Sequence, residues 1–518
     1  MKAISLKRQA LHPLLPEEEK QLNNNNTIPD LKKTGLTACL FLCSLFCYGQ
    51  EKQWLADEKL NRAYTRVLNL QVDEARTLLN EIKTPEQIYV ASLADALELL
   101  VTEDEGKFDI YEVEYEKRLD QLERIEPLTA DALFALAELR LQWAFTYLKF
   151  GHEFDAAWNI RQAYLAVQEC KKKSPGFIPI KKSSGLLEIM LGSVPEKYQW
   201  VMNVLNMEGS IETGLQDLQY VMNNCPRLSL ETALLANLFR GFILQQTESA
   251  AAGFDEIVRQ HPAQNLALFL GASVAIKNSQ SEKALTYLTR LKDGNAGLRI
   301  PYLFYQLGEV YLHKGEYESS IRSFQKFLDN YSGQNYIKDS YYKTGICYWL
   351  SENPSKAAKY FNRAKEEGRE SSEADKYAAR NLIEGYPNVK LSKIRYATDG
   401  GYYDQARKIA SSVTERELST PKEKIEFTYR KARLAHKSGS VADAKKDYLE
   451  TIHKQGDENW YYAPNACLQL GYLLMELQQH TEAKEYFEKA LTYKKHEYKN
   501  SIDSKAKSAL TQLKEHGE

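Results

Sequence analysis

The sequence lacks most of the patterns that metal or nucleophile chemistry requires. Its seven cysteines form no Cys-x-x-Cys pair, and its nine histidines form no His-Glu-x-x-His pair, which excludes the common zinc and dithiol motifs. Neither Gly-x-Ser-x-Gly nor Gly-x-Gly-x-x-Gly occurs, so the usual nucleophile elbow and dinucleotide loop are missing as well. We therefore expect no catalytic residue, no metal ligand and no cofactor.

One short stretch comes close to a phosphate loop. Residues 176–183 spell Gly-x-x-x-x-Lys-Lys-Ser, but Lys181 stands where the second glycine belongs and Pro179 lies inside the stretch. No predicted strand leads into it, as a phosphate loop requires. The net charge of −2 also leaves no basic field along the whole chain, so nucleic acid is not an expected partner.

Proline is scarce too, and the fractions of apolar and charged residues suit a folded protein. Only 15 prolines occur in 518 residues, and they gather at apparent breaks. Long stretches can therefore stay helical, because proline interrupts a helix interior. Apolar residues make up 43% and charged residues 27% of the chain, as in ordinary folded domains.

Residues 31–49 have the pattern of a secretory signal peptide. Lys32 and Lys33 precede an apolar run from Leu36 to Tyr48, and Gly49 follows it. A basic start, a short apolar core and a small residue at its end are typical of such signals, and the run is too short to span a membrane comfortably. We expect a periplasmic or secreted mature chain without a transmembrane span. Residues 1–30 form a polar extension, which we interpret as a translation start assigned too far upstream.

Two other interpretations of this region stay open. Residues 36–39, Leu-Thr-Ala-Cys, have the letters of a lipobox, although they precede the apolar core that a lipobox normally follows. Alternatively, the apolar run is a buried helix, which would leave the protein in the cytoplasm.

Small and aromatic residues recur at fixed offsets along the chain. The clearest copies are Phe304, Leu307-Gly308, Tyr311, Gly315, Tyr317, Ser320, Phe324 and Phe327; then Tyr341, Gly345, Tyr348, Ala357, Phe361 and Ala364; then Cys467, Leu470-Gly471, Leu474, Ala483, Phe487 and Ala490. Small residues stand where two helices must touch, and aromatic residues fill the contact. The spacing predicts an all-α fold, an α-solenoid of stacked antiparallel helical hairpins, and it places Cys347 and Cys467 in the core.

The regularity of the repeats changes along the chain. We expect degenerate helical repeats in residues 50–295, clearer repeats in 296–385 and 386–500, and a C-terminal helix or tail in 501–518. Breaks are predicted at 293–297 and 385–387, where glycine and proline gather. A further loop is expected to run from Lys171 to about Gly185.

At these positions the chain resembles a tetratricopeptide-repeat protein of the secreted or periplasmic bacterial type. The run from Phe324 to Tyr348 resembles the repeats of bacterial envelope-biogenesis proteins, although Ser332 stands where that family usually has proline. Residues 192–215 are similar, over a short stretch, to eukaryotic family thirty-nine of the tetratricopeptide proteins. The resemblance implies a superhelix whose concave groove holds a protein or peptide, with association with the cell envelope.

Helical geometry indicates which residues would line such a groove. With each repeat aligned on its glycine, one stripe forms the packing seam and a second stripe lies roughly 130° away, which the resemblance assigns to the groove. Besides the groove residues named next, the second stripe contains Leu312, Asp339, Ile346, Asn465, Leu468 and Met475. The predicted groove residues are Tyr302, Tyr305, Glu309, Tyr342, Trp349 and Tyr472. The alternative is that these aromatic residues pack only between neighbouring repeats.

The favoured function is a non-enzymatic scaffold of the bacterial cell envelope that binds a protein or peptide. One alternative is a glycan-binding subunit of an outer-membrane nutrient-uptake system, because related proteins of that kind contain such repeats. Another is a cytosolic adaptor with the same repeats.

Overall fold

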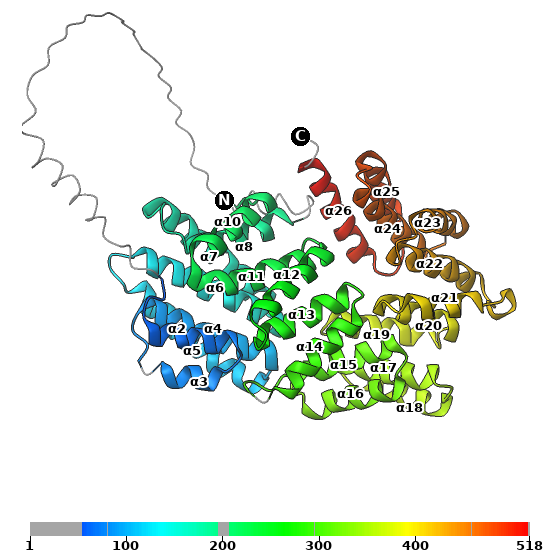
Figure 1. Cartoon of the computed structure of the whole chain (residues 1–518), viewed down its shortest axis with the longest axis horizontal. Helices are drawn as coiled ribbons and strands as arrows, with labels where there is room; N and C mark the ends of the chain where they lie inside the picture. Colours follow the sequence, from blue (N-terminus) through cyan, green and yellow to red (C-terminus); the bar gives the residue numbers. More distant parts are fainter. Residues whose placement is uncertain (1–53, 80, 195–206, 295, 457, 516–518) are drawn as a thin grey trace, which may run out of the picture. The chain divides into compact units, whose positions relative to one another are not determined.

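The computed structural model describes residues 54–79, 81–194, 207–294, 296–456 and 458–515. Within these ranges the chain forms 24 α-helices and no strand (Figure 1), which confirms the predicted all-α solenoid. The predicted extension at 1–30 and signal peptide at 31–49 lie outside the described residues. None of the described helices is both long and apolar enough to cross a membrane.

The helices of the first half, residues 54–294, vary in length from seven residues in α3 to 21 in α6 and α7. They are α2 (Glu58–Leu68), α3 (Val72–Leu78), α4 (Pro85–Thr102), α5 (Glu105–Glu123), α6 (Ala130–Phe150), α7 (Glu153–Lys173), α8 (Ile180–Gly192), α10 (Ile211–Asn224), α11 (Pro226–Phe242), α12 (Thr247–Gln260), α13 (Asn265–Lys277) and α14 (Ser281–Asp293).

The helices after residue 296 are more uniform. They are α15 (Tyr302–Lys314), α16 (Tyr317–Asn330), α17 (Ile337–Leu350), α18 (Pro354–Glu366), α19 (Glu373–Glu384), α20 (Val389–Gly400), α21 (Tyr403–Ser411), the 3-10 helix η2 (Glu415–Glu417), α22 (Pro421–Lys437), α23 (Val441–Gln455), α24 (Tyr462–Glu476), α25 (His480–Thr492) and α26 (Lys499–Glu515).

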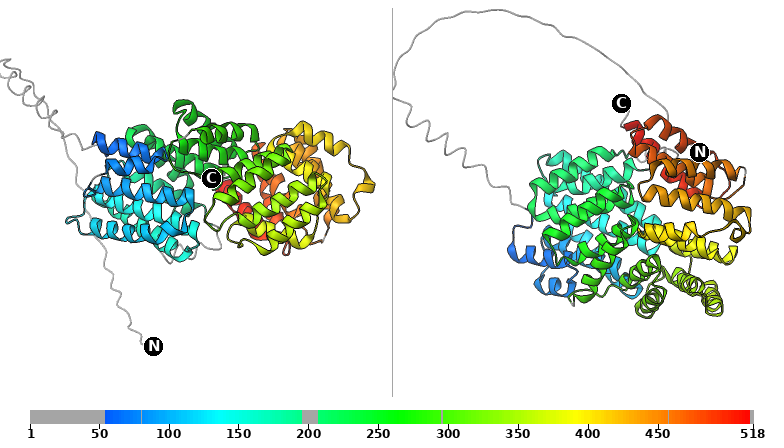
Figure 2. Two further views of the ribbon diagram at one scale, coloured as in Figure 1. Left: turned by 90° about the horizontal axis from the view of Figure 1, so that it is seen from below. Right: turned by 45° about the vertical axis from the view of Figure 1, so that its right-hand side comes forward.

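Successive helices pack as antiparallel hairpins, and each hairpin packs on the next (Figures 1 and 2). The pairs include α13 with α14, α15 with α16, α17 with α18, α22 with α23, and α24 with α25. Helix α19 follows α18 without a hairpin partner of its own and lies against α17. Because α19 leaves the hairpin pattern, it brings its side chains over the face of α17.

Local signals fix where these helices begin and end. At α22, Thr420 and Glu423 form a reciprocal capping box, and Pro421 takes the first helical position, where its missing N–H costs nothing. Helix α15 ends at Gly315, whose φ of 81° is in the left-handed region that glycine adopts without a steric penalty. Both ends were readable from the sequence.

The predicted glycine seam is confirmed. A Cβ atom at Gly308, Gly345 or Gly471 would lie 2.6 Å from a ring carbon of Phe324, Phe361 or Phe487, respectively. In each hairpin the aromatic ring of the second helix occupies the space that a side chain on the first would need.

We expect Gly345→Ala to destabilise the protein by about 1–3 kcal/mol, because the new methyl group overpacks against the Phe361 ring. Gly176→Ala is the matched control: no atom lies within 4 Å of its Cβ position, so it should be neutral or stabilise by up to about 1 kcal/mol through the unfolded chain. Guanidinium unfolding followed by circular dichroism measures both. Equal midpoints for the two variants would show that the seam is not tightly packed.

Two of the predicted breaks are confirmed and one is wrong. The segment 293–297 follows the end of α14, and 385–387 joins α19 to α20. The loop predicted to reach Gly185 ends earlier, because α8 begins at Ile180 and contains Gly185. That glycine allows a close helix crossing, since its Cβ position lies 2.8 Å from the carbonyl oxygen of Gly214 in α10.

Candidate functional site

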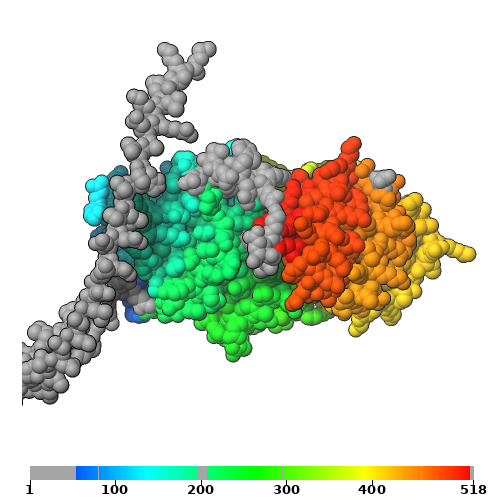
Figure 3. All heavy atoms as spheres, turned by 90° about the horizontal axis from the view of Figure 1, so that it is seen from above, coloured from blue at the N-terminus to red at the C-terminus, as the bar shows by residue number. Residues whose placement is uncertain are grey.

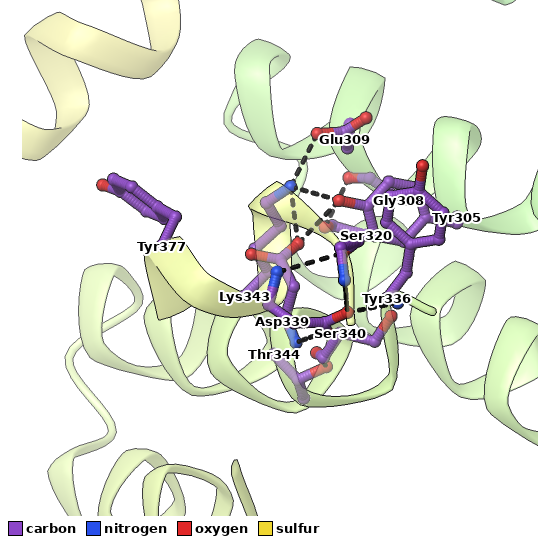
Figure 4. A network of polar contacts seen from close by, with 12 residues as sticks. Tyr305, Gly308, Glu309, Ser320, Tyr336, Asp339, Ser340, Lys343, Thr344 and Tyr377 are labelled. Carbon is purple, nitrogen blue, oxygen red and sulfur yellow. Dashed lines mark hydrogen bonds and ion pairs between the residues drawn. The ribbon is translucent and has the colours of Figure 1, made fainter. Parts of the chain in front are cut away.

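A buried polar network joins α15 and α17. Lys343 Nζ lies 2.6 Å from Glu309 Oε1 and 2.8 Å from Asp339 Oδ2 (Figure 4). It also donates to the Tyr305 hydroxyl at 2.7 Å, and that hydroxyl donates to Asp339 Oδ2 at 2.6 Å. Tyr305 and Glu309 are four residues apart, as are Asp339 and Lys343, so each pair lies on one face of its helix and the two faces meet.

Burial and charge act against each other in this network. Burial disfavours the Lys343 ammonium, but the Asp339 and Glu309 carboxylates outweigh burial and raise the lysine pKa. The pKa of Asp339 is raised because burial of this carboxyl outweighs the opposing effect of Lys343. Asp339 Oδ1 is buried without a hydrogen-bond partner among the described residues. A fixed cation thus stands beside an oxygen that can still take part in a hydrogen bond.

A small cavity of about 250 Å³ opens next to this network. Its walls come from α15, α17, α19 and α20. They are formed by Glu309, Leu312, His313, Asp339, Lys343, Ala374, Tyr377, Arg395, Tyr396 and Asp399. Burial lowers the pKa of His313, which favours its neutral form, and its Nδ1 lies 3.1 Å from the Ser281 hydroxyl. The cavity therefore presents both signs of charge together with aromatic surface.

A second cavity of about 450 Å³ shares Tyr377, Arg395 and Tyr396 with the first. We call the two together the Tyr–Arg cleft. The second cavity is unusually rich in tyrosine, contributed by Tyr342, Tyr377, Tyr386, Tyr396, Tyr461, Tyr462 and Tyr498. Its bases and acids are Arg395, Arg430, Lys422, Glu384, Glu423 and Glu426.

Arg395 lies at the junction of the two cavities. Its guanidinium carbon is 5.0 Å from the ring centre of Tyr377 and 5.4 Å from that of Tyr396, distances at which cation–π attraction operates. Nε lies 3.6 Å from Asp399, and the arginine side chain remains 28% exposed. The guanidinium is thus held in place by its neighbours while part of it stays accessible to a ligand.

The predicted groove residues divide between cleft walls and packing contacts. Glu309 lines the smaller cavity and Tyr342 the larger one. Tyr302 stacks on Tyr305 with ring centres 5.1 Å apart, and Tyr305 is only 2% exposed. Tyr342 is 3% exposed, so only a small part of its ring faces the larger cavity.

The other two predicted residues, Trp349 and Tyr472, do not line this cleft. Trp349 donates its indole N–H to the Pro387 carbonyl at 2.8 Å and packs against Tyr386. Tyr472, on α24, packs against Phe487. Packing between repeats, the alternative that the sequence left open, accounts for Tyr305, Trp349 and Tyr472, and ligand binding by the stripe stays a prediction.

Sequence reasoning did not select Tyr377, Arg395, Tyr396 or Asp399. Tyr377 lies on α19, which has no hairpin partner, and the other three lie on α20. Their signal was the spacing of Arg395 and Asp399, four residues apart, in a helix next to a tyrosine-rich segment.

The cysteines are confirmed as core residues. Cys347 and Cys467 are fully buried, and all four cysteines of the described part of the chain are unpaired. Burial raises the pKa of the Cys347 and Cys467 thiols to about 12, so neither forms a reactive thiolate at neutral pH. The described residues contain no group of three or more His, Cys, Asp or Glu side chains placed to hold a metal ion.

Sequence comparison identifies the repeats directly. A family model described as tetratricopeptide repeat matches residues 305–372, and another with the same description matches residues 464–497. The chain therefore contains tetratricopeptide repeats, as predicted, in the segments that carry the glycine seam. Such repeats form protein-interaction scaffolds and are generally non-catalytic. No curated protein matches the chain.

Several solved structures share the helical-repeat architecture at low identity. One is PilW, described as a widely conserved type IV pilus biogenesis factor: 15% identity, 47% of this chain and 97% of that chain covered, TM-score 0.33. Another is the human IFIT1 dimer with m7Gppp-AAAA, at 12% identity, 85% and 96% coverage and TM-score 0.34. A third, the APC/C hetero-tetramer Cut9-Hcn1, has 13% identity, 89% and 91% coverage and TM-score 0.27. Likenesses of this size do not extend to function.

Proposed function

We propose that this protein is a non-enzymatic scaffold of the cell envelope and that it binds a segment of a partner protein in the Tyr–Arg cleft. The observation that carries the proposal is the junction at Arg395, where a partly exposed guanidinium is held between two tyrosine rings. Tyrosine and arginine are the side chains that most often dominate protein interfaces. A cleft with both in fixed positions loses little side-chain entropy on binding.

The chemistry of the cleft favours a peptide over a single small molecule. The two cavities together offer space for several side chains, and both signs of charge line them. The accessible part of Arg395 can donate to the C=O groups of an extended chain. The envelope location rests on the secretory pattern of residues 31–49 and is tested by the compartment in which the full chain is recovered.

Replacement of Tyr377 or Arg395 by alanine is expected to weaken partner binding by about 2 kcal/mol or more, roughly 30-fold, as for other interface hot spots. The partner is first captured by cross-linking in intact cells and then titrated in purified form. Tyr220→Ala and Arg407→Ala are the controls, since both side chains are about half exposed and lie outside the cleft. Unchanged affinity of the cleft variants with unchanged helicity would exclude this site.

A further inference from the structure

Four cations in the described part of the chain, on α13, α22 and α26, have no carboxylate within ion-pair distance, and electrostatic effects link them to one another. They are Lys277 at the end of α13, Arg433 and Lys437 on one face of α22, and Lys505 on α26. Other interior cations have close partners: Lys182, Lys343, Lys149 and Arg430 each lie within 3 Å of a carboxylate oxygen, and Lys338 donates to the Ala364 carbonyl at 2.7 Å. We call Lys277, Arg433, Lys437 and Lys505 the cationic cluster.

Helices from distant parts of the sequence bring the cluster together. Helix α26 faces the ends of α8 and α11 across a cavity of about 460 Å³, and the C-terminal helices lie directly beside those of the middle of the chain (Figure 3). Lys505 lines this cavity together with Phe242, and Lys277 Nζ lies 5.0 Å from the centre of the same phenyl ring. The two lysines therefore approach one aromatic residue from different helices.

One face of α26 is suited to bind an anion. Ser501, Ser504, Lys505 and Ser508 all line the cavity, and their spacing of three and four residues places them on a single helical face. Three hydroxyl groups beside an ammonium can donate hydrogen bonds to the oxygens of an anion.

The cations act on one another. Burial and then Lys505 and Lys437 lower the pKa of Lys277 to about 8. Burial and then Arg433 lower the pKa of both Lys437 and Lys505. Asp399, Glu476 and Glu248 act in the opposite direction on Lys437, but none of them is within ion-pair distance. Because like charges held together oppose folding, an anion at this place would remove an existing cost.

We propose that the cationic cluster binds a small multivalent oxyanion of the phosphate type beside Phe242, held by Lys277 and Lys505 and by the serine face of α26. A lysine ammonium is a compact point charge that binds phosphate oxygens without a fixed geometry. Several such charges from different helices concentrate a multivalent anion more strongly than a univalent one. The site is separate from the Tyr–Arg cleft and does not depend on its ligand.

Isothermal titration calorimetry of the full chain with inorganic pyrophosphate tests this site at constant ionic strength in chloride. We expect saturable binding and, near pH 8, a proton uptake that is larger in the wild type than in Lys277→Met, because the bound anion raises the lowered pKa of Lys277. Titration in two buffers of different ionisation enthalpy measures the uptake. Absence of saturable binding would overturn the proposal.

Substitutions locate the binding on the molecule. Lys505→Met and Lys277→Met should each weaken pyrophosphate binding by about tenfold or more, while their unfolding midpoints in chloride stay equal or rise, because repulsion is relieved. Lys484→Met, at a 58% exposed lysine of α25, should change neither quantity. Pyrophosphate affinity that is the same in all three variants and the wild type would place the anion elsewhere. Lys505→Gln serves as a second variant if the methionine substitution prevents folding.

Discussion

Replacing Lys182 by methionine is expected to destabilise the protein by about 3–5 kcal/mol, the loss typical when one partner of a buried ion pair is removed. The ammonium is fully buried and lies 2.6 Å from both Glu138 Oε2 and Glu231 Oε1. It also donates to the Tyr89 hydroxyl at 3.1 Å. Without it, two carboxylates face each other in the core with no cation between them.

The same cluster connects five helices. Tyr64 on α2 and Tyr89 on α4 donate to Glu231 on α11, while Ser183 on α8 donates to Glu138 on α6. Lys182 is the cation shared by the carboxylates of α6 and α11. Its loss therefore weakens several helix contacts together, and the cost should appear as cooperative unfolding of the first half of the chain.

The stability lost in Lys182→Met is expected to depend on pH. In the wild type, burial already raises the pKa of Glu138, against the opposing effect of Lys182. Removal of the lysine raises it further, so the folded variant holds a proton that the unfolded chain releases. Stability of the variant should then fall as the pH rises above about 4.5, the ordinary value for glutamate, and its deficit relative to the wild type should shrink towards acid pH.

Lys181→Met provides the matched control for this prediction. Lys181 is the neighbouring residue and is 35% exposed; it pairs with the mostly buried Asp217, which keeps a hydrogen bond from Ser184 when the lysine is removed. Its loss should cost no more than about 1 kcal/mol, with little dependence on pH. Guanidinium unfolding of both variants between acid and neutral pH measures the difference. Equal losses in the two variants would mean that the buried cluster contributes no more than a surface pair.

Phe487→Ala is expected to cost about 3–5 kcal/mol, because it leaves a cavity in a close-packed hairpin. The ring is fully buried against Gly471 and Tyr472 of α24. In an array of repeats each unit contacts mainly its neighbours, so the damage should stay local. Hydrogen exchange followed by mass spectrometry should show lost protection in residues 462–515 before the middle of the chain is affected.

An exposed phenylalanine provides the control, because its replacement by alanine removes the same ring without opening a cavity. Phe154 is 91% exposed, and Phe154→Ala should change stability by less than about 0.5 kcal/mol. Loss of protection spread evenly over the whole chain in Phe487→Ala would contradict the view that the C-terminal repeats form a locally stabilised unit.

The hairpin fold was predictable because its signals are local. Gly345 and Phe361 recur at offsets that the helical period converts directly into a contact, and the capping residues of α22 lie within four positions of one another. These relations hold within one repeat, so a single sequence is enough to find them. The same locality explains why the repeats in 296–385 and 386–500 were clearer than those in 50–295.

The Tyr–Arg cleft and the buried lysine depend on contacts between distant segments. Tyr377 and Arg395 meet only because α19 leaves the hairpin pattern and lies over α17. Lys182 lies 44 and 49 positions from its two carboxylates, and a lysine in the chain normally indicates a solvated surface. The groove stripe was derived from one helix at a time. It found Glu309 and Tyr342 but not the residues that α19 and α20 add.

The central claim is that a partner protein occupies the Tyr–Arg cleft, and site-specific photo-cross-linking in intact cells tests it most directly. A photoreactive amino acid at position 377 should give a discrete adduct that disappears when Arg395 is also replaced by alanine. The same amino acid at position 220, an exposed tyrosine on α10, should not give that adduct. An identical adduct from both positions, or one that survives the loss of Arg395, would contradict binding in the cleft.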